Sequence, residues 1–141
     1  MMTIRTYQPE NETDVITLWQ ECGLTVPWND PKKDIQRKLD ENPDLFFVGF
    51  IKDMLMASCL AGYDGHRGWI YYLAVQPAFQ RRGHAKQLVR RVEQALAAVG
   101  CPKVNLMVRQ TNTAVLDFYR TIGYGDDPVL VLSRRLEDDT A

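Results

Sequence analysis

A cluster of basic and small residues lies between a strand-like run and a helix-like run. The stretch FQRRGHAKQL, residues 79–88, follows the apolar run WIYYLAV and opens an amphipathic segment. The first N–H groups of a helix have no partner within it and lie at the positive end of the helix dipole, so phosphate groups bind there. Gly83 lets a ligand approach the backbone, and Arg81 and Arg82 can donate charge-assisted hydrogen bonds. These residues therefore predict a site for a phosphate-bearing ligand.

This stretch matches neither of the two phosphate-binding loops that are most readily recognised in a sequence. The chain contains no G-x-x-x-x-G-K-[ST] and no G-x-G-x-x-G. On these residues alone, a solvated basic helix start without any ligand remains the alternative to a different kind of phosphate loop.

The elements that must position this stretch predict an α/β fold. Strand-like runs cover residues 3–7, 103–108 and 128–136, and residues 44–75 hold three more, separated by KD and YDGHRG. Helix-like runs cover residues 10–22, 29–42, 83–99 and 112–123. The two short separators are typical of hairpin turns, so the three central runs form an antiparallel meander. We expect a mixed, mostly antiparallel central sheet flanked by about four helices, in the order strand, two helices, three strands, helix, strand, helix and one or two strands.

The composition is typical of one folded, soluble domain, residues 1–141. The 17 Lys and Arg residues oppose 18 Asp and Glu residues, so the net positive charge of a nucleic-acid-binding protein is absent. The three cysteines are odd in number and far apart, which favours a reducing compartment, and no Cys or His spacing is typical of a metal site. Neither a secretion signal nor a membrane span is evident, so we expect a cytoplasmic protein that binds no membrane.

Two motifs resemble those of the GNAT superfamily of N-acetyltransferases, and they occur in that family's order. VQPAFQRRGHAKQLV resembles the acetyl-coenzyme A (acetyl-CoA) loop, whose pattern Q/R-x-x-G-x-G/A is filled by Gln80, Gly83 and Ala85. NTAVLDFYRTIGY resembles the later helical motif, which contains Asn112 and Tyr119. The resemblance covers essentially the whole chain, and PWNDP and AGYDGHRG are similar to stretches of the small bacterial acetyltransferases labelled YpeA. It implies the GNAT fold.

The resemblance also implies the roles of individual residues. Acetyl-CoA is expected to bind to the strand before the loop, to the loop itself and to the start of the later helix, that is, to Leu73, Ala74, Val75, Gln80, Arg81, Arg82, Gly83, His84, Ala85 and Asn112. A backbone N–H near Val75 is expected to stabilise the oxyanion. Tyr119 is expected to protonate the departing thiolate, because a phenol with a pKa of ~10 stays protonated at neutral pH. No metal is implied.

The general base and the amine acceptor are less well defined. Many family members carry a glutamate on the strand before the loop, whereas WIYYLAV has no carboxylate. Glu21, Asp64 and His66 are the candidates, and a water relay or an amine that arrives neutral are the alternatives. The resemblance implies an acceptor region that contains Trp28, Asn29, Asp30, Tyr63, Asp64 and His66. Turn and cap chemistry explains several of these equally well, since Asp30 suits a helix N-cap.

We therefore expect an acetyl-CoA-dependent N-acetyltransferase in which a primary amine attacks the thioester directly. The acceptor, a small molecule or a protein amine, is not specified by the sequence. A non-catalytic acyl-CoA-binding sensor on the same fold is the alternative, which Tyr119 disfavours and the missing strand carboxylate leaves open. Strand edges near residues 128–136 are compatible with a homodimer.

Overall fold

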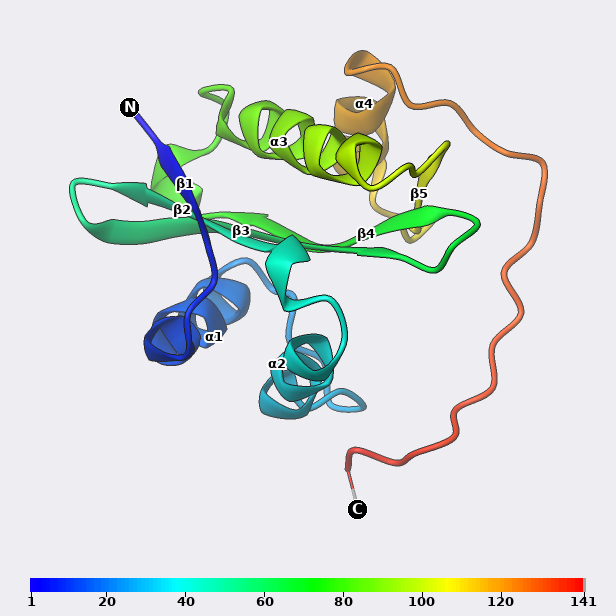
Figure 1. The fold of residues 1–141 in the computed structure, drawn as a ribbon, viewed down its shortest axis with the longest axis horizontal. Coiled ribbons are helices and arrows are strands. Elements are labelled where there is room, and N and C mark those ends of the chain that lie inside the picture. The colour runs from blue at the N-terminus through cyan, green and yellow to red at the C-terminus, as the bar shows by residue number, and fades with distance from the viewer. Residues whose placement is uncertain (141) are drawn as a thin grey trace.

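Five of the six strand-like runs form one sheet in the computed structural model, which describes residues 1–140 (Figure 1). The strands lie side by side in chain order: β1 (Thr3–Thr6), β2 (Phe46–Ile51), β3 (Met54–Tyr63), β4 (Gly68–Val75) and β5 (Val104–Leu106). Pairing is antiparallel from β1 to β4, whereas β4 and β5 are parallel. The predicted mixed, mostly antiparallel sheet is thereby confirmed.

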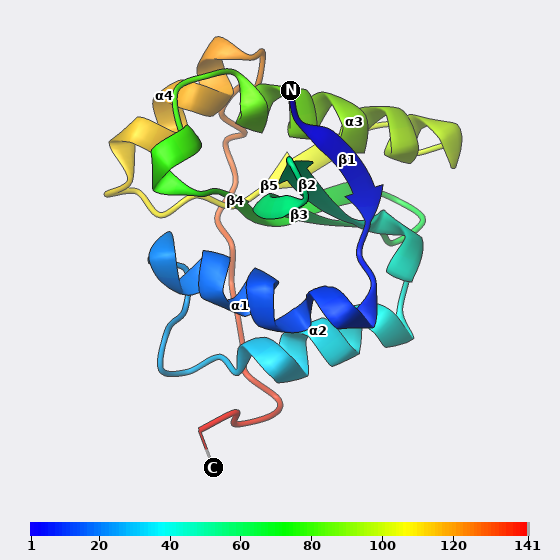
Figure 2. The same ribbon diagram turned by 90° about the vertical axis from the view of Figure 1, so that its left-hand side faces the viewer.

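Two helices cover each face of this sheet. They are α1 (Glu12–Glu21), α2 (Pro31–Asp40), α3 (His84–Ala98) and α4 (Thr113–Thr121), and short 3-10 turns occupy Pro9–Asn11, Pro43–Leu45 and Pro77–Phe79. Figures 1 and 2 show α1 and α2 on one side of the sheet and α3 and α4 on the other. Each side has its own apolar core. One contains Trp19 of α1 and Phe46 of β2, and the other contains Met56 of β3 and Leu88 of α3. The sheet therefore separates two layers, and β4 contributes to both.

The helix ends follow the local sequence chemistry. The Asp30 carboxylate accepts hydrogen bonds from the backbone N–H groups of Lys32 (2.9 Å) and Lys33 (3.4 Å), so it caps α2 as expected. Gly100 and Gly123 follow α3 and α4 with φ of 89° and 107°, the left-handed conformation that ends a helix.

Strand β4 departs from regular pairing on both of its edges. Towards β3, the register shifts between Ser58 and Leu60, so that Tyr72 and Leu73 together lie opposite one residue of β3. Towards β5, the last pair joins Ile70 and Leu106, although β4 continues to Val75. The first feature is a β-bulge. The second leaves the β5-facing backbone at the end of β4 without a strand partner.

The final strand predicted for residues 128–136 is wrong. This segment leaves α4, passes the edge of the sheet and ends near α2, without forming a strand (Figure 1). Leu130 and Leu132 are 87% and 91% exposed. An alternating apolar pattern reports a propensity but supplies no partner, and the neighbouring β5 has only three residues. The chain directly after this segment is held at α2, because Arg37 forms ion pairs with Glu137 and Asp139.

Candidate active site

The connection from β4 to α3 opens a helix N-terminus to solvent. Gly83 is the N-cap of α3 with φ of 84°, a conformation that glycine adopts without strain. The first backbone bond of the helix runs from the Gln87 N–H to the Gly83 carbonyl (3.0 Å), so the N–H groups of residues 84–86 precede the intrahelical ladder. Arg81 and Arg82 are exposed, and no atom lies within 4 Å of a Cβ placed on Gly83. The N–H groups therefore border open, positively charged space.

Side chains from the loop fasten it to the end of β4. The Gln80 amide donates a hydrogen bond to the Val75 carbonyl (2.9 Å), which also accepts one from the Cys22 thiol (3.3 Å). The motif glutamine thus sets the distance between the strand end and the helix start. Within β4, Ala74 and Val75 are buried and Leu73 is half-buried, so a ligand beside them would contact mainly backbone.

Tyr119 lies on the α3 side of the sheet, packed edge-on against neighbouring aromatic rings. Its ring centroid is 5.0 Å from that of Phe118 and 5.4 Å from that of Tyr124. Burial, with a smaller contribution from Cys59 of β3, raises the pKa of Tyr119, so the phenol is neutral. Across residues 1–140 its hydroxyl has no protein hydrogen-bond partner. The group is therefore available as a proton donor to a ligand.

A cleft of about 970 Å³ lies beside Tyr119, between α3, β5, α4 and residues 129–131. None of the described residues that line it belongs to the loop at 79–85. This cleft is therefore not the phosphate site, which is an open surface.

Asn112 begins the helix that carries Tyr119. Its side-chain oxygen accepts a hydrogen bond from the Val115 N–H (3.3 Å), so the residue caps α4 as its type and position suggest. The amide NH₂ of Asn112 is not used in this cap and can donate to another group.

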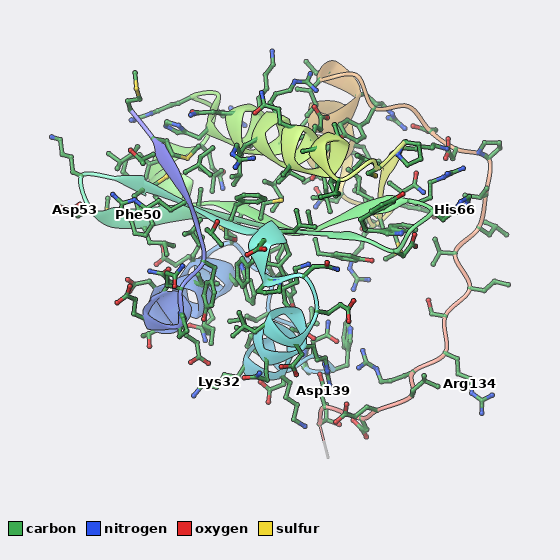
Figure 3. All side chains as sticks on the ribbon, viewed as in Figure 1. Lys32, Phe50, Asp53, His66, Arg134 and Asp139 are labelled. Carbon is green, nitrogen blue, oxygen red and sulfur yellow. The ribbon has the colours of Figure 1, made fainter. Side chains whose placement is uncertain are left out.

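The residues predicted for the acceptor region occupy two separate places. Tyr63, Asp64 and His66 lie at the turn between β3 and β4, and Figure 3 shows His66 at the end of the sheet opposite to Phe50 and Asp53. Strand β4 has eight residues at about 3.3 Å each, and this turn lies at its start whereas Val75 is its last residue.

The Asp64 carboxylate is committed to this turn. It accepts hydrogen bonds from the N–H groups of Arg67 (2.7 Å) and His66 (2.8 Å), and these bonds lower the pKa of Asp64. A carboxylate with a lowered pKa is a weak proton acceptor, so Asp64 acts as a turn residue in this structure.

The loop between α1 and α2 lies beside the segment that follows β5. The guanidinium of Arg109 lies over the ring of Trp28, 5.6 Å from its centroid. Arg135 donates a hydrogen bond to the Asn29 side chain (2.9 Å), and the N–H of Asp30 donates to Asp139 (3.1 Å). Nothing in the sequence pattern indicated that Arg109 would meet Trp28, because the two residues are far apart in the chain.

Of the three candidates for the general base, the structure brings Glu21 to the end of β4. Its carboxylate accepts a hydrogen bond from the Gln76 side-chain amide (3.3 Å), and Gln76 directly follows the strand. The other Gln76 side-chain atom, Oε1, is buried and is the only such side-chain oxygen or nitrogen of residues 1–140 without a partner. Glu21 and Gln76 therefore form a polar pair where β4 and β5 have separated.

Two other kinds of site are absent from the part of the chain that the structure describes. No three or more His, Cys, Asp or Glu side chains gather there in a way that could hold a metal ion. No helix there combines the length and apolar character needed to cross a membrane.

Sequence relatives cover nearly the whole chain. The model of the acetyltransferase (GNAT) family matches residues 13–124. A protein of Sodalis glossinidius (strain morsitans), acetyltransferase SG1711, is 48% identical over 139 residues, 98% of each chain. Acetyltransferase YE1169 of Yersinia enterocolitica is 46% identical over 135 residues, 96% of each chain.

Solved structures show the same fold. AAC(6')-Iy, in complex with the bisubstrate analog CoA-S-monomethyl-acetylneamine, superposes with a TM-score of 0.79 at 18% identity, over 96% of this chain and 98% of that one. The ribosomal-protein-S18-alanine N-acetyltransferase of Escherichia coli gives a TM-score of 0.75 at 18% identity, over 90% of this chain and 79% of that one. The resemblance seen in the sequence motifs is thus confirmed, and the chain belongs to the acetyltransferase (GNAT) family.

Proposed function

We propose that the protein is an acetyl-CoA-dependent N-acetyltransferase whose acceptor is a primary amine. The observation that carries the proposal is the separation of β4 from β5 beyond Ile70, directly before a glycine-capped helix start with two exposed arginines. An extended ligand arm can add to the free backbone edge of a strand, and a pyrophosphate can bind the helix N-terminus that follows. A coenzyme A thioester, which carries an extended pantetheine arm followed by a pyrophosphate, matches both features in succession.

The residues around these two features fit the coenzyme. The backbone of residues 73–75 would bind the pantetheine arm, with Asn112 as a further donor. The N–H groups of His84 and Ala85, together with Arg81 and Arg82, would bind the phosphates. Space is available, because a Cβ on Gly83 would meet no atom within 4 Å. A relative in fold, AAC(6')-Iy, has been solved with an analog that contains CoA.

Tyr119 would act as the proton donor when the carbon–sulfur bond breaks. The bound thioester supplies the acetyl group. The amine nitrogen forms the new bond to the carbonyl carbon, a backbone N–H near Val75 stabilises the oxyanion, and the thiolate takes a proton from the phenol. The raised pKa of Tyr119, caused by burial, keeps that proton in place until the thiolate forms.

Glu21 would accept the proton that the attacking amine loses, directly or through water. Its position beside Gln76, at the end of β4, supports this role. Asp64 and His66 are not proposed, because the β3–β4 turn lies at the far end of the strand. The acceptor would enter from the side of Trp28, between the α1–α2 loop and the segment after β5.

Two observations favour the alternative, a non-catalytic acyl-CoA sensor. Strand β4 carries no carboxylate, so the general base must come from another element, and the proton donor Tyr119 is only 7% exposed. Both proton transfers, from the amine and to the thiolate, therefore depend on precise placement of the ligand. A sensor would bind the coenzyme equally well and would release no thiol.

Turnover with a panel of amines distinguishes the two functions. Free thiol would be measured after mixing the protein with acetyl-CoA and a peptide N-terminal amine, a lysine side chain, a polyamine or an aminoglycoside, and the product would be identified by mass spectrometry. The enzyme predicts thiol release that requires one class of amine and yields its N-acetyl product. Coenzyme binding without thiol release from any amine would favour the sensor instead.

A further inference from the structure

Tyr72 has a backbone conformation that is unusual for a bulky residue in a strand. Its φ is 52°, in the left-handed region, although it lies in the middle of β4. Such a conformation is strained for a residue with a side chain, and it persists only when surrounding contacts hold it. Strained residues of this kind gather at functional sites, so the contacts of Tyr72 identify what holds the strand in shape.

Three elements hold Tyr72 in place. Its ring stacks on Trp19 of α1, with centroids 3.9 Å apart and planes 13° from parallel. Its carbonyl accepts a hydrogen bond from the Ser58 hydroxyl of β3 (3.0 Å), which itself accepts one from the Trp19 indole N–H (2.9 Å). Its own hydroxyl donates to the Asp34 carboxylate of α2 (2.6 Å). Ring, carbonyl and hydroxyl are therefore all fixed.

The carboxylate that receives the Tyr72 hydroxyl is fixed in turn. The other oxygen of Asp34 accepts a hydrogen bond from Arg37 (2.9 Å), and Arg37 also binds Asp139 (2.6 Å) near the chain end. Asp139 also accepts a hydrogen bond from the Asp30 N–H at the start of α2 (3.1 Å), and Figure 3 labels Asp139 beside this helix. Burial and the neighbouring Asp34 raise the pKa of Tyr72, so the phenol keeps its proton and remains the donor.

The bulge at Tyr72 decides which backbone groups of β4 face the open edge. Ile70 and Leu73 both pack on the α3 side, with two residues between them instead of one, so the alternation of the strand is reset at this point. Pairing with β5 also ends at Ile70. The bulge therefore separates the paired part of β4 from residues 73–75, which the proposed function assigns to the pantetheine arm.

We propose that Tyr72, held by Asp34, is a positioning residue for acetyl-CoA: the hydrogen bond from its hydroxyl to α2 maintains the β4 bulge that presents the backbone of residues 73–75 to the coenzyme. This inference rests on the proposed function. It assigns no contact between Tyr72 and the coenzyme. Its effect is exerted through the strand.

Four variants test this role by calorimetric titration with acetyl-CoA. Tyr72→Phe removes the hydroxyl and keeps the stacked ring, Asp34→Asn keeps the shape of the acceptor and removes its charge, and the third variant combines both. Tyr71→Phe is the matched control, because it makes the same change on the preceding, exposed tyrosine of the strand. We expect each single variant to weaken affinity about tenfold, the double variant to be no weaker than the singles, and the control to stay within about twofold of the wild type.

Kinetics supply a second measurement that a merely structural role would not change. The KM for acetyl-CoA should rise in Tyr72→Phe while kcat at saturating coenzyme stays within about twofold, because the reacting groups are untouched. If the wild type binds and both single variants bind within twofold of it, the positioning role is overturned and the proposed function stands, even if the variants are less stable. If the wild type does not bind, both are overturned. Should Tyr72→Phe fail to fold, Asp34→Asn, at a half-buried position of α2, decides alone.

Discussion

Gly83 offers a test of the proposed coenzyme site that can be separated from the stability of the fold. Its φ is 84°, and a Cβ there would meet no atom within 4 Å. Gly100, just past the other end of the same helix, has φ of 89° and equally empty surroundings. Alanine at either position therefore adds backbone strain without a clash. We expect each substitution to lower the free energy of unfolding by about 1–2 kcal/mol, the penalty for an L-residue in this conformation.

The two substitutions should differ in their effect on coenzyme binding. A methyl group on Gly83 would project beside the N–H groups at the start of α3 and would keep the pyrophosphate from reaching them. Loss of one charge-assisted hydrogen bond, about 1.5–3 kcal/mol, corresponds to at least tenfold weaker binding. Gly83→Asp adds repulsion of about 4 kcal/mol between unit charges 4 Å apart at an effective dielectric constant of 20, close to a further thousandfold.

Urea denaturation and calorimetric titration with acetyl-CoA measure the two effects on the same samples. Gly83→Ala and Gly100→Ala should lower the free energy of unfolding by similar amounts. Only Gly83→Ala should raise the Kd for acetyl-CoA, by at least tenfold. Gly83→Asp should show no measurable binding. An unchanged Kd in both Gly83 variants would refute the placement of the pyrophosphate at α3.

Three further experiments test separate parts of the structure: a pair of tyrosine variants, a serine variant and cysteine labelling. Tyr119→Phe should lower kcat about 10²–10⁴-fold with little loss of stability, because the Tyr119 hydroxyl has no protein hydrogen-bond partner among the described residues. Tyr124→Phe is the contrasting variant, because it loses a hydrogen bond to a carboxylate of α3. It should lower the free energy of unfolding and retain turnover. Ser58→Ala leaves the Trp19 indole N–H buried without an acceptor. In urea denaturation it should therefore lower the free energy of unfolding by about 1–3 kcal/mol. A loss below about 0.5 kcal/mol would contradict the hydrogen-bond network around β4. Burial raises the pKa of the Cys59 thiol to about 12, so a thiol reagent at pH 8 should label the two other cysteines and leave Cys59 unlabelled until the protein unfolds.

The parts of the fold that the sequence predicts are those that local patterns determine. The stripe of α3 is an example, since Leu88, Val89, Val92 and Leu96 recur at helical spacing and are all buried. Two short turn stretches likewise predict the meander from β2 to β4. In each case the residues that decide the structure are neighbours in the chain.

Features that depend on distant residues could not be read from the pattern. Residues 128–136 have the alternation of a strand, but their partner would have to be β5, which is short, and the ion pairs with Arg37 hold the chain directly after this segment at α2. The left-handed conformation of Tyr72 has no local signal, because tyrosine favours regular strands. Glu21, rather than His66, lies at the end of β4 as the candidate general base, and this depends on how α1 packs against the sheet. The assigned roles of the site residues remain predictions.

Calorimetric titration of the wild-type protein with acetyl-CoA tests the central claim most directly. ATP and the 3′-dephospho analogue of the coenzyme serve as controls for binding of phosphate groups alone. The proposed function predicts micromolar binding of acetyl-CoA, weaker binding of the analogue and none of ATP at the same concentration. Absence of binding, or equal binding of ATP and acetyl-CoA, would contradict it and leave residues 79–88 as an exposed basic helix start.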